Sequence, residues 1–288
     1  MELRTLAYAE AVARLGGFTR AARELHVAQP AVSTQIAQLE RELGVRLFVR
    51  TPRGVTTTEA GELLVARARR ILTEAAAVHA DIDALRGLVT GRLNIGATPL
   101  LGGVDLAGAL AAFRRAHPHV VVRTHTDLVD PLLVALDSAQ LDVVLGPVED
   151  PGAARHQVDV LAEESVVLAC PPGLSPPPRD LAEASSHEFV CLPATSGLRR
   201  ILDRAAHEAN VTLAVTTEVA TTSQIREFVA AGLGVALLAA SAARGPGPEI
   251  RVIELDPPVP HPPFAALRPT GRSSPAADAF VALLLASR

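Results

Sequence analysis

The chain has 288 residues, enough for about two domains with well-buried cores. Its 27 basic residues are all arginine, its net charge is −4, and two cysteines are too few for a disulfide framework. No apolar run reaches the length of a membrane span, so we expect no membrane partner. The opening residues, MELRTLAYAE, lack the basic-then-apolar order of a secretory signal, which favours a cytoplasmic protein.

The charge is unevenly distributed along the chain. Residues 1–57 contain eight arginines and five acidic residues, a net charge of +3, whereas the rest of the chain carries −7. A basic head on an acidic body is a weak indication that the head meets a polyanion.

Residues 1–57 are predicted to form short helices joined by tight turns. Apolar residues at helical spacing begin at Leu3, and Gly16-Gly17 ends this first helix. Thr19 is the expected N-cap of a second helix that ends near Leu25. A third helix runs to about residue 43, and two β-prone pieces around a Pro-Arg-Gly turn predict a small hairpin after it.

The third helix, within HVAQPAVSTQIAQLE, has an unusual outward face. At about 100° per residue, Val32, Ile36 and Leu39 share the inward side. Pro30 suits the first helical position, where no backbone donor is needed. The outward side carries short, uncharged residues: Pro30, Ser33, Thr34, Ala37 and Gln38. Such a face can enter a DNA major groove and hydrogen-bond base edges or phosphates, so we predict a helix-turn-helix with this helix as the reader.

Two further features of the head carry weaker signals. Arg50 and Arg53 flank Pro52, and Arg53 at the hairpin tip could reach a minor groove or a phosphate. His26 precedes the third helix and is expected to be a turn residue rather than a DNA contact. The alternative for the whole head is a helical hairpin whose outer face only meets water.

Residues 58–89 are predicted to form one long helix. Thr58 caps it, and Glu59 and Glu62 favour its positive end. Apolar residues alternate in steps of four and three for more than three heptads, the spacing of a coiled-coil seam. The seam comprises Leu64, Ala68, Ile71, Ala75, Val78, Ile82 and Leu85. We predict that it joins two copies of the chain, and the alternative is a helix packed on its own domain's core.

From about residue 90 onward, strands and helices alternate, the βαβ pattern of a parallel sheet. Near the Glu163-Glu164 turn the alternation of strands and helices is interrupted by two consecutive strands, and a second α/β set follows. This order fits two lobes with two crossings between them. Lobe I is expected at about 90–162 and 266–288, and lobe II at about 163–265.

The first sixty-odd residues carry a dense motif, FTRAARELHVAQPAVSTQIAQLERELGVRLFVRTPRGVTTTEAG. At this density it resembles the N-terminal motif of the LysR-type transcriptional regulators. VAAGLGVALL, at 229–238, resembles a phrase of that family's effector domain. Gly17 departs from the serine usual in the motif, which puts one phosphate contact in doubt. Thr34 replaces a longer polar residue, so the base preference does not carry over.

The resemblance implies an α/β fold class with three parts. Residues 1–57 would form a winged helix-turn-helix, residues 58–89 a linker and dimerisation helix, and residues 90–288 a two-lobed effector domain like type 2 periplasmic binding proteins. The partners would be double-stranded DNA at operator sites, a small effector and further copies of the chain, as a dimer or tetramer. The implied DNA-binding residues are Thr19, Gln29, Pro30, Ser33, Thr34, Gln38, Arg50 and Arg53.

The effector would sit between the lobes, where helix N-termini favour an anion. Thr98 follows the first strand of lobe I, and Thr195-Ser196 precedes a helix of lobe II. The full set of implied lining residues is Thr98, Pro99, Leu100, Thr126, Gly146, Thr195 and Ser196. The alternative within the family is an effector-independent regulator with a closed or empty cleft.

Other classes of protein have less support. The sequence lacks a glycine-flanked serine elbow, zinc-ligand spacing and a phosphate-binding glycine loop, so we expect no enzyme, metal or cofactor. A solute-binding transport protein would fit the lobes but not the head. Cys170 and Cys191 stand in apolar strands and are expected to be ordinary core thiols without a redox role.

Overall fold

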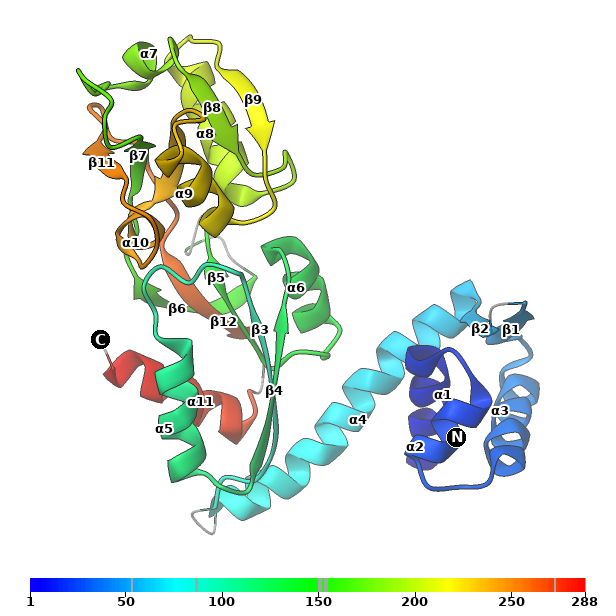
Figure 1. Cartoon of the computed structure of the whole chain (residues 1–288). Coiled ribbons are helices and arrows are strands. Elements are labelled where there is room, and N and C mark those ends of the chain that lie inside the picture. The colour runs from blue at the N-terminus through cyan, green and yellow to red at the C-terminus, as the bar shows by residue number, and fades with distance from the viewer. Residues whose placement is uncertain (53, 86–87, 150–151, 153–154, 272, 288) are drawn as a thin grey trace.

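The computed structural model describes residues 1–288 except 53, 86–87, 150–151, 153–154, 272 and 288. It has three parts in chain order: a small helical head, a long helical rod and a body of two α/β lobes (Figure 1). The rod runs from the head to the base of lobe I, and lobe II lies at the far end of the body (Figure 1).

The head consists of three helices and an antiparallel hairpin: α1 (Leu3–Leu15), α2 (Phe18–Glu24), α3 (Gln29–Leu43), β1 (Phe48–Thr51) and β2 (Gly54–Thr57). Ala21 and Ala22 of α2 are buried, which lets the helices cross closely. Val32, Ile36 and Leu39 of α3 are at most 2% exposed, as their helical spacing predicted. The side of α3 opposite these residues is therefore turned to the outside.

Two boundaries in the head differ from the sequence prediction. Helix α2 begins at Phe18, so Gly17 holds the N-cap position predicted for Thr19. The reason is the tight turn after α1, where Gly16 adopts a φ of 63° and brings the next helix in at once. Helix α3 begins at Gln29, which makes Pro30 its second residue instead of its first. Pro30 remains in the first turn, where no backbone donor is required.

The turn between α2 and α3 contains His26, with a φ of 54°. Its backbone N–H donates to Arg23 O at 3.3 Å. This confirms His26 as a turn residue, and its left-handed conformation is one that few residue types adopt.

The rod is helix α4 (Glu59–Leu85). Thr58 caps it, as predicted: its Oγ1 accepts from Gly61 N at 3.0 Å and donates to Arg46 O at 2.7 Å. Gly61 is needed here because a Cβ at this position would lie 2.0 Å from Leu47 O. Beyond this joint α4 packs along α1, so the first turns of the rod and the head form one unit.

Lobe I is a five-stranded sheet with the strand order β4-β3-β5-β12-β6. Strands β3, β4 and β5 are parallel, and β12 runs antiparallel to both of its neighbours. Helices α5 and α11 cover one face around Phe113 and Phe280, and α6 covers the other through Leu132. The elements are β3 (Gly91–Ala97), α5 (Leu106–Ala116), β4 (Val120–Thr126), α6 (Val129–Asp137), β5 (Val143–Pro147), β6 (His156–Ala162), β12 (Phe264–Pro269) and α11 (Pro275–Ala286).

Lobe II has two hydrogen-bonded strand groups, β10-β7-β11 and β8-β9. Val190 N donates to Val235 O at 2.9 Å, and this contact joins β8 to the chain entering β10. The elements are β7 (Val166–Cys170), α7 (Leu181–Ala184), β8 (Glu188–Cys191), α8 (Gly197–Glu208), β9 (Ala214–Glu218), α9 (Thr222–Ala230), β10 (Ala236–Ala239), α10 (Ala240–Arg244) and β11 (Arg251–Glu254).

The chain crosses between the lobes twice. Strands β6 and β7, on either side of the Glu163-Glu164 turn, belong to different lobes, and the return leads from β11 to β12. An antiparallel bridge between Ser165 and Pro260 links the two crossings. Within the described part of the chain, every helix is too short or too polar to span a bilayer.

Candidate DNA-binding interface and inter-lobe cleft

The outward side of α3 is short and uncharged over its first ten residues, Gln29 to Gln38. Four of the predicted outward residues are exposed there, and Ser33 is half-buried. The exposed four are Pro30, Thr34, Ala37 and Gln38. Because residues 29–38 carry no carboxylate and most of their exposed side chains are short, a DNA backbone or base edge can approach the helix closely.

A hydrogen bond within α3 orients two of the predicted readers. Gln29 Nε2 donates to Ser33 Oγ at 2.7 Å. Since the serine oxygen accepts, its own proton is available to donate outward, and Gln29 Oε1 is available to accept. The pair therefore presents one donor and one acceptor side by side, a combination that can read a base edge.

One carboxylate of α3 fixes the hairpin. Glu40 Oε1 accepts from Leu47 N at 2.8 Å and from Phe48 N at 3.2 Å, at the start of β1. Glu40 holds the wing in a set position relative to α3. The sequence analysis did not identify this role, because backbone donors leave no signal in the side-chain pattern.

A pocket of about 520 Å³ lies between the start of α2, the start of α3 and the wing. Thr19, Gln29 and Arg50 line it, so three residues predicted from separate segments meet on one side of the head. The Arg50 guanidinium lies 5.9 Å from the ring centroid of Phe18, which steadies an otherwise exposed side chain. Arg53 lies outside the described residues.

The predicted seam of α4 divides into two parts. Ala68 is fully buried where α4 packs on the chain's own head, so its prediction as a dimer contact is wrong. Leu64 also packs on the head core. Periodicity identified an apolar face of α4 but not which surface covers each turn of it.

Farther along α4, the seam is open. Ile71, Val78 and Ile82 are 39%, 54% and 46% exposed, and Ala75 is half-buried. The side chain of Leu85 lies outside the described ones. Three large apolar side chains on one face of an exposed rod are an unpartnered surface of the kind that another chain covers.

In lobe I, the cleft residues gather where β3 and β5 end. Thr98 is 9% exposed, and its Oγ1 donates to Leu100 O at 2.7 Å. Gly146 packs against it, since a Cβ at that position would lie 3.0 Å from the Thr98 methyl group. Pro99 is exposed, as is Thr126 at the end of β4.

In lobe II, the cleft residues form the start of α8. Ser196 is the N-cap, with its Oγ 3.4 Å from Arg199 N, and it is 8% exposed. Thr195 is exposed, and its carbonyl accepts from Arg200 Nη1 at 3.2 Å. Among the described residues, no hydrogen bond joins this group to the group in lobe I. The hydroxyls of Thr98 and Ser196 are both engaged within their own lobes.

Two stretches of the chain match descriptions of known families. Residues 3–62 match "Bacterial regulatory helix-turn-helix protein, lysR family". Residues 86–288 match "LysR substrate binding domain". The chain belongs to the LysR family of transcriptional regulators.

Two relatives of this LysR-family chain are regulators, and each matches it over most of both chains. The nitrogen assimilation regulatory protein nac of Escherichia coli (strain K12) is 32% identical over 248 residues, covering 85% of this chain and 80% of that protein. The RuBisCO operon transcriptional regulator of Allochromatium vinosum is 30% identical over 241 residues, covering 83% and 79%.

Two solved structures are similar to the whole chain. A single-residue variant of full-length OxyR from Pseudomonas aeruginosa has a TM-score of 0.77 and 25% identity, covering 100% of this chain and 94% of that one. Full-length CbnR complexed with its target DNA has a TM-score of 0.68 and 25% identity, covering 100% of both chains. The winged head, the rod and the two lobes are thus an arrangement of the LysR family.

The two cysteines of this LysR-family chain are core residues. Cys170 ends β7 and Cys191 ends β8, with exposures of 0% and 3%. Burial raises the pKa of each thiol to about 11. Both thiols therefore stay protonated at neutral pH, and the protonated thiol is a poor nucleophile toward peroxide or disulfides.

We predict that neither thiol reacts with Ellman's reagent at pH 8 while the chain is folded. Both should react after unfolding in guanidinium chloride, because exposure restores their ordinary pKa. The measurement is the absorbance of released thionitrobenzoate under each condition. Rapid release of one equivalent from the folded chain would contradict the burial and protonation of these thiols.

Proposed function

We propose that this chain is a sequence-specific, DNA-binding transcriptional regulator that acts in the cytoplasm and is not an enzyme. Residues 1–57 are the DNA-binding domain, residues 58–89 the linker and dimerisation helix, and residues 90–288 the effector domain. The observation that carries the proposal is the uncharged outward side of α3, with the Gln29–Ser33 pair set by a 2.7 Å hydrogen bond. Family membership supports the same conclusion.

Within the head, α3 reads sequence and the wing adds affinity. The readers on α3 are Gln29, Pro30, Ser33, Thr34 and Gln38. Thr19 and Arg50 contact the phosphate backbone, because they flank the reader on α2 and on the wing. Arg53, next to Pro52 in the sequence, is assigned the same role from the sequence alone. Contacts to phosphates position a protein on DNA, and contacts to base edges supply selectivity.

Gln29→Ala and Ser33→Ala should each weaken binding to an operator duplex by about 1–3 kcal/mol, because each removes one partner of the reading pair. Binding to unrelated DNA should change little. Arg50→Ala should weaken binding to all duplexes. It should also reduce the steepness of the plot of log binding constant against log salt concentration by about 1. The measurement is a gel-shift titration at several salt concentrations.

The matched control is Ser186→Ala, an exposed serine in lobe II, which should bind as the wild type does. If Gln29→Ala and Ser33→Ala both kept full operator affinity, α3 would not be the reader.

The open part of the α4 seam joins two copies of the chain. Its central residues are Ile71 and Val78, with Ala75 between them and Ile82 beyond. Burying three large apolar side chains from each chain stabilises such a pair, at about 1.5–3 kcal/mol for each fully buried side chain. Because the head is packed on the same helix, pairing of two rods also sets the distance between two readers.

We expect Ile71→Asp with Val78→Asp to break this pair, because the substitutions would bury charge in the seam without a partner. Light scattering of the purified chain should then report a lower mass. The matched control is Leu63→Asp with Ala76→Asp, which adds the same charge to the same helix outside the seam. An unchanged mass for the seam variant would rule the assignment out.

A small anionic effector binds between the lobes. The lining residues are Thr98, Pro99, Leu100, Thr126, Gly146, Thr195 and Ser196. Support comes from the start of α8, where unpaired backbone donors and the helix dipole favour negative charge. Arg200 lies at the same helix start and adds a positive charge. The ligand can shift the chain between two forms only by binding one of them more tightly.

A thermal-shift screen of small organic acids tests this cleft. An acid that binds, present at a concentration about a hundredfold above its dissociation constant, should raise the free energy of unfolding by about 2.7 kcal/mol. Thr98→Val with Thr195→Val should lose the shift, while Thr216→Val, an exposed threonine on β9, should keep it. Equal shifts in the wild type and the double variant would remove these threonines from the site.

A second candidate is a regulator whose cleft takes no effector. The observation in its favour is that the Thr98 hydroxyl already donates to Leu100 O at 2.7 Å. A broad library without a single hit would favour this candidate, and DNA binding by the head would stand unchanged.

A further inference from the structure

The carbonyl oxygen of Gly16 joins three segments of the head. It accepts from Val55 N of β2 at 3.1 Å and from Arg20 Nη2 of α2 at 2.8 Å. The wing approaches it closely, since a Cβ at Gly54 would lie 2.8 Å from this oxygen. The turn after α1, helix α2 and the wing therefore meet at one acceptor.

The hydrogen bond to Gly16 holds the side chain of Arg20 in place, although Arg20 is exposed. Its guanidinium group lies over a turn of two glycines. A Cβ at Gly16 would lie 3.0 Å from Arg20 Nη2, and a Cβ at Gly17 would lie 3.6 Å from Arg20 Nε. The bond to Gly16 uses one N–H, and a guanidinium group has five. The remaining donors are thus held at a set place beside the wing.

The acidic residue one helical turn after Arg20 is already engaged. Glu24 stands four residues later on α2, a spacing at which arginine and glutamate commonly pair. Arg14 of α1 takes this carboxylate instead, with its Nη1 3.1 Å from Glu24 Oε2. Arg20 makes the hydrogen bond to Gly16 and, among the described residues, no ion pair. Its positive charge is therefore available to a partner.

Arg20 and Arg50 both line the pocket of about 520 Å³ between α2, α3 and the wing. The register of the hairpin sets Arg50 opposite Val55, whose N–H shares the Gly16 carbonyl oxygen with Arg20. The described residues of the lining include these two arginines and no carboxylate. An anion seated there would meet guanidinium groups from two different segments.

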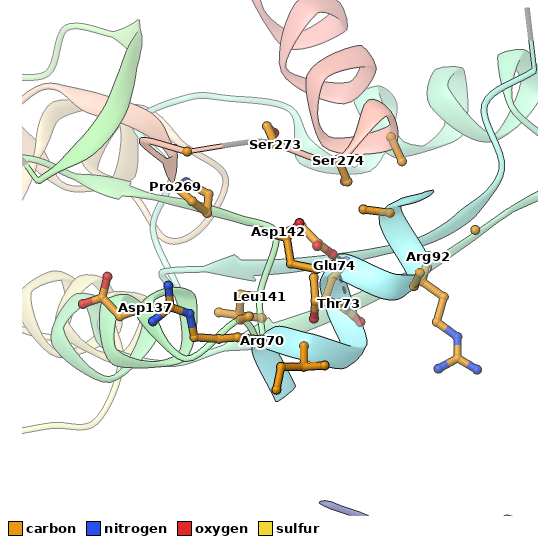
Figure 2. Close-up of a pocket in the computed structure, with 18 of the residues that line it drawn as sticks. Arg70, Thr73, Glu74, Arg92, Asp137, Leu141, Asp142, Pro269, Ser273 and Ser274 are labelled. Carbon is orange, nitrogen blue, oxygen red and sulfur yellow. Dashed lines mark hydrogen bonds between the residues drawn. The ribbon is translucent and has the colours of Figure 1, made fainter. Parts of the chain in front are cut away.

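A larger cavity, between α4 and lobe I, shows the contrast. Arginines such as Arg70 and Arg92 line it too, but its lining also carries Glu74, Asp137 and Asp142 (Figure 2). Opposite charges within one lining offset each other. The pocket on the head has no such compensation among its described lining residues.

We infer that Arg20 is a further DNA-contacting residue, and that Arg20 and Arg50 together grip one phosphate of the operator backbone. This inference rests on the proposed function of the head. Guanidinium groups bind phosphate through paired, charge-assisted hydrogen bonds. Because Gly16 O and the Phe18 ring already hold the two side chains, little side-chain freedom is lost when the phosphate binds. A phosphate held beside the start of α3 sets the register of the reader on the duplex.

The test uses an operator duplex that the wild-type chain selects from a pool of random sequences. Each backbone phosphate of this duplex is replaced in turn by an uncharged methylphosphonate, and fluorescence anisotropy at constant salt measures the affinity. One replacement should weaken wild-type binding about 10-fold, since a charged contact is lost. The same replacement should weaken binding by Arg20→Gln and by Arg50→Gln only about 3-fold each, because the other arginine still contacts the phosphate. The double variant should lose nothing further.

The matched control is Arg23→Gln, which removes an exposed arginine from the same helix outside the pocket. It should show the wild-type loss of about 10-fold at that phosphate. Arg20→Lys replaces Arg20→Gln if the glutamine variant does not fold. It keeps the charge without the paired donors, so its loss should fall between those of the wild type and Arg20→Gln.

The inference is wrong if the cost of every methylphosphonate is the same with and without Arg20. It is also wrong if Arg50→Gln alone abolishes the loss, because Arg20 would then hold the wing through Gly16 without touching DNA. The ratio of affinities for operator and unrelated DNA should stay at its wild-type value in Arg20→Gln, whereas Gln29→Ala lowers it. A wild-type chain that selects no sequence from the pool would contradict the proposed function itself, and this inference with it.

Discussion

The close approach of Gly61 to the carbonyl oxygen of Leu47 is the contact on which the arrangement of head and rod depends. Any side chain at Gly61 would place its Cβ 2.0 Å from that oxygen. Beside it, Thr58 caps α4 and donates to Arg46 O, so one hydroxyl both starts the rod and ties it to the hairpin. The head and the first turns of α4 therefore move as one body.

Because this joint is rigid, the direction of α4 determines where α3 lies. The 27 residues of α4 make a rod of about 40 Å, with α3 fixed at one end and lobe I at the other. Glu40 extends the same rigidity to the wing through two backbone N–H groups. A change in how α4 meets lobe I is therefore transmitted to the reader without any change inside the head. In the proposed regulator, closure of the lobes on an effector acts through that meeting point.

The sequence predicted the parts of the fold that follow from periodicity. The inward residues of α3 and the alternating body were predicted correctly, because one face of each element must be buried. Ala68 was assigned wrongly, since the spacing of apolar residues does not say whether the chain's own head or a partner covers them. Thr19 was misplaced by the unusual turn at Gly16. The contact of Glu40 with Leu47 N and Phe48 N was beyond prediction, because backbone donors leave no signal in the side-chain pattern.

Helix α3 and the wing, held rigidly on the rod, are the surface that we propose binds DNA. Hydrogen–deuterium exchange of the full chain, with and without an operator duplex, tests this assignment most directly. We predict slower exchange in α3 and in the β1–β2 hairpin on adding the duplex, with little change in the strands of lobe II. Slower exchange in the lobes together with an unchanged α3 would contradict it.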